Sequence, residues 1–118
     1  MTLDEFFADH PSSKAIFYAV QRKAESLGGV SLRVTKSMIS FRREYNFAWA
    51  WIPGRYLTGR TSPLVLTVSL RWRDGSPRWK EIVEPAPGRF THHLELNDPA
   101  EVDEEVKGWL RSAWELAD

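Results

Sequence analysis

The feature of this chain that most limits its fold is a run of strand-like segments from residue 30 to residue 96 with no helical segment between them. In these segments apolar residues alternate with polar ones or form β-branched runs, which is typical of strands. Parallel strands need long crossover connections, usually helices, between them. We therefore expect an antiparallel sheet, and helical patterns on both sides of it predict an α+β fold.

Six segments are predicted strands: 30–34, 38–43, 47–52, 63–72, 78–84 and 89–96. In 47–52, strand alternation predicts Phe47, Trp49 and Trp51 on one face and small residues on the other, where a helix can approach closely. Asp74-Gly75 has the strongest tight-turn signal in the chain, and the weak strand after it is expected at an edge. The prediction is a mostly antiparallel, meandering sheet of five to six strands.

Helical patterns precede and follow the sheet. A capping box starts a short helix at Thr2, and Ser12 or Ser13 is expected to cap a longer helix that stops at Gly28-Gly29. After the last strand, Asp98 is expected to cap an amphipathic C-terminal helix. The apolar stripe of that helix consists of Val102, Val106, Trp109, Leu110, Ala113 and Trp114.

The composition excludes several classes of protein. A chain of 118 residues fits a single domain, 1–118, that can hold a hydrophobic core. Because there is no cysteine, disulfides, thiolate metal sites and cysteine nucleophiles are excluded. No apolar run approaches the roughly 20 residues that span a bilayer, and residues 1–10 are acidic, unlike a signal peptide. We expect a cytoplasmic protein without membrane contact, and no motif predicts a metal or other cofactor.

The net charge of zero hides a segregation of charge along the chain. Residues 33–90 contain eleven basic and four acidic residues, whereas residues 91–118 contain two basic and eight acidic ones. One interpretation is a polarised surface that attracts anions. The other is that the acidic C-terminal helix packs beside the basic sheet and neutralises it.

The loop 53–63, PGRYLTGRTSP, has a spacing close to that of a phosphate-binding P-loop, with arginine in place of lysine. A P-loop needs a helix after it to direct backbone amides at phosphate, but Pro63 and a strand follow here. A P-loop is therefore rejected. Arg55, Tyr56 and Arg60 still suit a loop that closes over an anionic ligand, and the alternative is an ordinary loop with solvated arginines.

The last strand, RFTHHLEL, contains two adjacent histidines. Strand alternation places His92 and His93 on opposite faces, so both cannot bind one metal ion. His92 shares its face with apolar residues, which fits a hydrogen-bonded core histidine or a pocket histidine that moves a proton. His93 and Glu95 share the other face, where they form a surface pair or orient each other.

Three classes of function fit these patterns. Arginines interleaved with Trp and Tyr suit a binding face for a small or anionic ligand, and a second candidate is stacking of single-stranded nucleic acid. A small hydrolase or transferase using a pocket histidine is the third. We expect a non-enzymatic binding or interaction module, with a protein partner or homodimer as a competing use of the same face. The predicted ligand contacts are Arg43, Trp49, Arg55, Tyr56, Arg60 and His92.

Three stretches resemble the bacterial family of domains of unknown function DUF5655: VTKSMISFRREYNFAWAW, PRWKEIVEPAPGRFTHHLEL and VKGWLRSAWELA. The resemblance covers nearly the whole chain, from HPSSKAIF at residue 10 onward. It implies a small α+β domain, found alone or attached to other modules and broadly similar to the DUF1801 domains. The family has no established activity or catalytic residues to carry over, so the resemblance supports the fold and leaves the function open.

Overall fold

The computed structural model describes residues 1–118 and contains three helices, six strands and two 3-10 turns. The helices are α1 (Leu3–Phe6), α2 (Pro11–Glu25) and α3 (Glu104–Leu116), and the 3-10 turns are Pro53–Arg55 and Pro99–Glu101. The strands are β1 (Ser31–Val34), β2 (Ile39–Arg42), β3 (Asn46–Trp51), β4 (Leu64–Leu70), β5 (Glu81–Ala86) and β6 (Arg89–Leu96).

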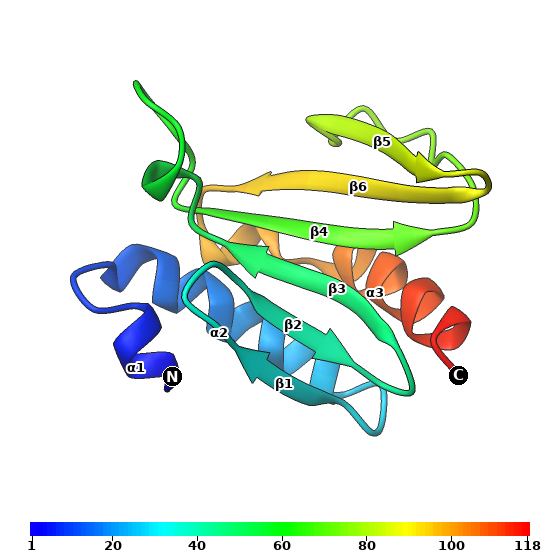
Figure 1. Cartoon of the computed structure of the whole chain (residues 1–118), viewed down its shortest axis with the longest axis horizontal. Coiled ribbons are helices and arrows are strands. Elements are labelled where there is room, and N and C mark those ends of the chain that lie inside the picture. Colours follow the sequence, from blue (N-terminus) through cyan, green and yellow to red (C-terminus); the bar gives the residue numbers. More distant parts are fainter.

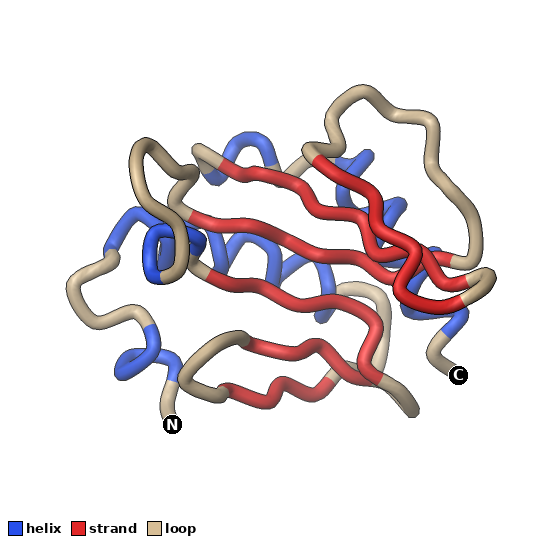
Figure 2. The backbone as a smooth tube through the Cα atoms, turned by 45° about the horizontal axis from the view of Figure 1, so that its top comes forward, coloured by secondary structure: helices blue, strands red, loops and turns tan.

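All six strands form one antiparallel sheet in the order β1-β2-β3-β4-β6-β5. The helices α2 and α3 lie on one face of this sheet, and no helix covers the other face (Figure 1, Figure 2). The predicted α+β class, the antiparallel sheet and the flanking helices are confirmed. We call the uncovered side the open face.

The hydrophobic core lies between the sheet and the two long helices. Because side chains alternate along a strand, every second residue of β4 reaches this core: Leu64, Leu66, Val68 and Leu70 are all fully buried. Ala48 and Ala50 of β3 are also buried, and their small side chains allow α3 to pack on β3 as predicted. The apolar stripe of α3 supplies the other side of the core through Val106, Trp109, Leu110 and Ala113.

The strand order departs from a simple meander at β5. The chain does not form a hairpin at Asp74-Gly75, since β4 pairs with β6 and β5 pairs with the outer edge of β6. Gly75 does not have the positive φ that a tight hairpin turn needs, whereas Gly88, between β5 and β6, has φ 75°. Asp74 instead accepts hydrogen bonds from Trp79 Nε1 at 2.9 Å and Ser76 N at 3.1 Å. The prediction that the weak strand lies at an edge is confirmed.

Two predicted helix starts are wrong in detail. Pro11 is the first residue of α2, and His10, at the N-cap position, makes no side-chain capping hydrogen bond. Ser13 lies inside the helix, and its hydroxyl donates to the carbonyl oxygen of Pro63 at 2.7 Å. Asp98 caps only the short 3-10 turn, and Asp103 caps α3 by accepting a hydrogen bond from Val106 N at 3.1 Å. The capping box at Thr2 is confirmed.

A β-bulge changes the direction of Phe47. The register passes from Phe41 opposite Ala48 to Arg42 opposite Asn46, so Phe47 is an extra residue in β3. Its side chain is 1% exposed and belongs to the core, with its ring 6.4 Å from that of Phe41. The predicted face shared by Phe47, Trp49 and Trp51 is therefore limited to the two tryptophans, which stay on the open face.

Candidate ligand-binding face

The open face has a continuous row of side chains across the whole sheet. The strand register joins one residue from each strand in this row: Arg33, Ser40, Trp49, Thr67, His93 and Glu81. Neighbouring strands are about 4.8 Å apart, so the row spans roughly 24 Å. Trp49, Thr67 and His93 occupy its centre, and Trp51 lies two residues beyond Trp49 on the same face.

Three adjoining hollows lie along the open face. The central hollow, of about 550 Å³, is lined by Ser37, Met38, Trp49, Trp51, Tyr56, Thr67, Thr91 and His93. The arginine hollow, of about 580 Å³, lies where the open face meets the C-terminal end of α3. It shares Trp49 with the central hollow, and Arg71, Arg89, Leu116 and Asp118 are among the residues that line it. The loop hollow, of about 520 Å³, shares Trp51 and His93 with the central one and includes Arg60, Lys80, Glu81 and Glu95. Because neighbouring hollows share lining residues, the three adjoin one another, and together we call them the depression.

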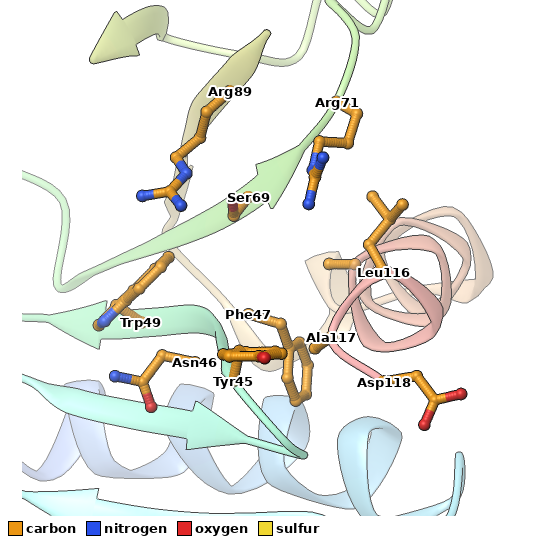
Figure 3. A pocket seen from close by; sticks show the side chains of 11 residues that line it. Tyr45, Asn46, Phe47, Trp49, Ser69, Arg71, Arg89, Leu116, Ala117 and Asp118 are labelled. Atoms are coloured by element: carbon orange, nitrogen blue, oxygen red, sulfur yellow. The ribbon is translucent and has the colours of Figure 1, made fainter. Parts of the chain in front are cut away.

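The arginine hollow has two unpaired cationic groups at its rim. Arg71 directly follows β4, and Arg89 is the first residue of β6. Each is one position beyond the paired residues Leu70 and Phe90, so both lie at the same end of the sheet. Figure 3 shows both side chains directed toward the hollow, with Trp49 at its side. Both are exposed, and neither makes a hydrogen bond or an ion pair within the protein. Their guanidinium groups are free to bind an anion.

The central hollow contains a chain of hydrogen bonds. Trp51 Nε1 lies 3.1 Å from Thr67 Oγ1, which lies 2.8 Å from His93 Nδ1. The indole nitrogen only donates, so the threonine oxygen accepts from it and the hydroxyl proton is available for His93 Nδ1. In that arrangement the neutral imidazole has its proton on Nε2, which has no protein partner. Burial lowers the pKa of His93, against a smaller opposing effect of Glu81, and so favours the neutral ring.

His92 faces the helices and does not line any of the three hollows. It is 0% exposed, accepts a hydrogen bond from Asp74 N on Nε2 at 3.0 Å and donates from Nδ1 to the Phe90 carbonyl oxygen at 3.2 Å. Its ring meets Trp79 edge to face, with centroids 4.8 Å apart. Both ring nitrogens are satisfied, which matches the core histidine that the sequence allowed. Burial lowers the pKa of His92 as well.

Two of the predicted ligand-binding arginines contact other parts of the protein. The Arg43 guanidinium lies 3.6 Å from the ring centre of Trp114 and donates to its carbonyl oxygen at 3.2 Å. The Arg55 guanidinium stacks 4.5 Å from the ring centre of Phe6 and donates to the Phe6 carbonyl oxygen. Arg43 thus attaches the β2–β3 connection to α3, and Arg55 attaches the 53–63 loop to α1.

The other predicted contacts are brought together on the open face. Trp49 and Tyr56 both line the central hollow, and Arg60 lines the adjacent loop hollow. Tyr56 reaches the central hollow from the 53–63 loop, with its ring centroid 6.4 Å from that of Trp51. The long loop therefore forms one wall of the depression.

A family model, Domain of unknown function (DUF5655), matches residues 3–117, nearly the whole chain. The chain belongs to the DUF5655 family. No curated protein and no solved structure matches the chain. The match supports the resemblance seen in the sequence, while the suggested similarity to DUF1801 domains stays a prediction.

The acidic C-terminal segment of this DUF5655 protein neutralises only part of the basic region. Arg78 donates to Asp103 at 3.0 Å and to Glu105 at 2.8 Å, and Arg43 lies 3.8 Å from Asp118. These pairs lie beside α3, whereas Arg71 and Arg89 on the open face have no such partner. Neutralisation by the C-terminal segment therefore applies to Arg43 and Arg78 and not to Arg71 and Arg89. No helix is long and apolar enough to cross a membrane, and no cluster of three or more His, Asp or Glu suits a metal ion.

Sequence reasoning missed several residues of the depression as ligand contacts. Alternation along β6 already places Arg89 and His93 on one face, so that signal was available. Arg71 and Thr67 join them only through the pairing of β4 with β6, which the sequence does not reveal. Trp51 shares a predicted face with Trp49 but is not among the predicted ligand contacts.

We predict that the DUF5655 protein loses stability as the pH falls from 7.5 to 5.5. In the unfolded chain both strand histidines take up protons near pH 6.5, whereas burial lowers their pKa in the folded state. The unfolded state then binds more protons, so the free energy of unfolding decreases below about pH 6.5, by roughly 1 kcal/mol per pH unit. Urea denaturation across this range measures the slope.

Variants of the two strand histidines test the cause. His92→Gln should make the pH dependence shallower without abolishing it, because His93 still contributes, and His92→Gln combined with His93→Gln should flatten it. Carboxylates with a lowered pKa, such as Asp74 and Asp103, take up protons below this range. Equal unfolding free energies at pH 7.5 and 5.5 would contradict the prediction.

Proposed function

We propose that this protein is a binding module whose open face takes an anionic ligand with a flat apolar ring. The observation that carries the proposal is the position of Arg71 and Arg89, unpaired and directed into a hollow that Trp49 also lines. A guanidinium group forms strong charge-assisted hydrogen bonds with carboxylate or phosphate oxygens. The acidic part of the ligand is assigned to this end of the depression.

The central hollow supplies the platform for the ring. Trp49 and Trp51 are half-buried, so they are held by the sheet while part of each indole remains accessible. Aromatic rings stack well on indoles, and the stacking tolerates different ring types. The Nε2 proton of neutral His93 offers a donor to an acceptor atom of the ligand.

The 53–63 loop completes the proposed site. Of the contacts predicted from sequence, Trp49, Tyr56 and Arg60 are proposed to touch the ligand, since they line adjoining hollows. Arg43 and Arg55 are proposed to hold the surrounding elements in position through their contacts with Trp114 and Phe6. His92 is proposed to act in the same indirect way, by attaching the loop before β5 to β6 through the Asp74 amide.

The proposal is tested with deoxyadenosine monophosphate as a probe that combines a ring with an anion. We expect saturable binding by calorimetry, with deoxyadenosine and inorganic phosphate each binding more weakly than the nucleotide. Replacing Arg71 and Arg89 together by alanine should weaken binding about tenfold or more, because charge-assisted hydrogen bonds contribute strongly to affinity.

The matched control removes two arginines from the helical layer. Arg22→Ala combined with Arg111→Ala makes the same change in net charge at exposed positions of α2 and α3. This variant should bind the nucleotide as the wild type does. Unchanged affinity in the Arg71 and Arg89 variant, or no binding of the nucleotide by the wild type, would refute the proposal and favour a protein partner or a second copy of the chain on the open face.

A further inference from the structure

Resting on this proposed function, we infer that the ligand class is single-stranded nucleic acid and that the open face holds successive nucleotides. The structure has ring platforms in series, arginines at both ends of the depression, and most of its acidic side chains outside the depression.

The two tryptophans form consecutive platforms. Trp49 and Trp51 are two residues apart on β3, both on the open face, so their attachment points are roughly 6.6 Å apart along the strand. Both line the central hollow, and Tyr56 adds a third ring beside Trp51 at 6.4 Å between centroids. A ligand with one ring needs only one of these platforms, whereas a chain of bases uses them in order.

The depression is longer than a site for one nucleotide. The three hollows, each of about 520–580 Å³, adjoin through Trp49 on one side and through Trp51 and His93 on the other. Arg71 and Arg89 lie at one end, and Arg60 and Lys80 lie at the other. An arginine at each end of a row of rings suits a strand in which phosphates alternate with bases.

The far end of the depression also suits recognition of a base edge. Lys80 is paired with Glu95 at 3.4 Å, so Arg60 is the cation of the loop hollow that has no ion pair. Glu81 lines the same hollow and makes no ion pair. A carboxylate accepts hydrogen bonds from an exocyclic amino group, as carried by adenine or cytosine. Such bases are therefore expected to fit better than thymine.

The distribution of charge explains how a protein with no net charge can bind a polyanion on one face. Asp103, Glu104 and Glu105 lie at the start of α3, in the helical layer behind the sheet. The open face has Arg33 and Arg42 on β1 and β2 in addition to Arg71 and Arg89, and all four side chains are exposed. Phosphates are therefore attracted to the open face and repelled from the start of α3.

The main probe is a labelled single strand of about eight deoxyadenylates. It is compared with deoxyadenosine monophosphate and with a labelled hairpin in which the same strand is paired with thymidylates. Fluorescence anisotropy measures the affinity of the labelled strands over a range of salt concentrations, and calorimetry measures that of the nucleotide. We expect the single strand to bind at least about tenfold more tightly than the nucleotide and than the hairpin, because several unpaired bases can stack on the tryptophans.

Two sets of variants separate stacking from charge. Trp51→Leu should weaken binding of the single strand by roughly five- to 150-fold, and Trp51→Phe, which keeps a ring, should recover most of the affinity. Trp72→Leu is the matched control, since Trp72 is exposed and lines none of the hollows. Replacing Arg71 and Arg89 by alanine should make the slope of log affinity against log salt concentration less steep by about 1.4. Each of the two lost phosphate contacts accounts for about 0.7 of this change.

The possible results distinguish this inference from the function on which it rests. If the nucleotide binds and the single strand binds no more tightly, the ligand is a single small anion, and the inference alone is overturned. If the duplex binds as tightly as the single strand and Trp51→Leu has no effect, the contact is only electrostatic and the inference is also wrong. If neither the nucleotide nor the single strand binds, the proposed function itself fails.

Discussion

Replacing Trp79 by alanine is expected to lower the free energy of unfolding by about 3–5 kcal/mol. Trp79 is only 9% exposed, and its ring centroid lies 4.1 Å from that of Trp109 and 4.8 Å from that of His92. Its Nε1 donates to Asp74 at 2.9 Å, so the change also removes one of the two hydrogen bonds that the Asp74 carboxylate accepts, and only the one from Ser76 N remains. The loss combines a cavity against α3 with a weaker attachment of the loop between β4 and β5.

Trp72 provides a control of the same residue type in the same loop. Its side chain is 45% exposed, so Trp72→Ala should cost less than about 1 kcal/mol. Urea denaturation followed by circular dichroism measures both variants. Similar losses for Trp72→Ala and Trp79→Ala would mean that Trp79 is not the residue that fastens this loop to the core.

The second large effect is expected from Phe17→Ala, with a loss of about 3–5 kcal/mol. Phe17 is fully buried on α2, and its ring lies 5.2 Å from that of Phe7 and 5.8 Å from that of Phe41. It therefore joins the N-terminal segment, α2 and the sheet in one aromatic cluster, and removing the ring leaves a cavity between all three. The melting temperature should fall by on the order of 10 °C.

The comparison for this variant is Tyr45→Ala, which removes an aromatic ring from the exposed β2–β3 connection. Tyr45 is 66% exposed, so its removal should change the melting temperature by only a few degrees at most. Thermal denaturation followed by circular dichroism compares the two variants. A Phe17→Ala protein that melts close to the wild type would show that the cluster does not hold the N-terminal segment to the sheet.

Local patterns were enough to predict most of the secondary structure. The period of two along β6 placed His92 with the apolar residues and His93 on the other face, and the structure buries His92 while His93 lines the open face. The stripe of α3 was predicted through Val106, Trp109 and Leu110, which are buried as expected. These predictions succeeded because side-chain direction within one element depends only on the geometry of that element.

The candidate site was predicted less well because it depends on neighbours distant in sequence. Arg43 and Arg55 were predicted to contact a ligand, but in the structure their guanidinium groups stack on Trp114 and Phe6. Arg71 and Arg89 came together because β4 pairs with β6 and not with β5. The turn signal at Asp74-Gly75 favoured the other pairing, whereas in the structure Asp74 lies in a longer loop and accepts a hydrogen bond from the buried Trp79.

Local periodicity and capping are enough to predict the α+β class, the antiparallel sheet, the amphipathic helices and the opposite directions of His92 and His93. The strand order, the bulge at Phe47 and the meeting of Trp49, Thr67, His93 and the two free arginines on one face become visible only when the chain is folded. Register and strand order depend on which distant side chains bury the most surface together, and no single segment contains that information.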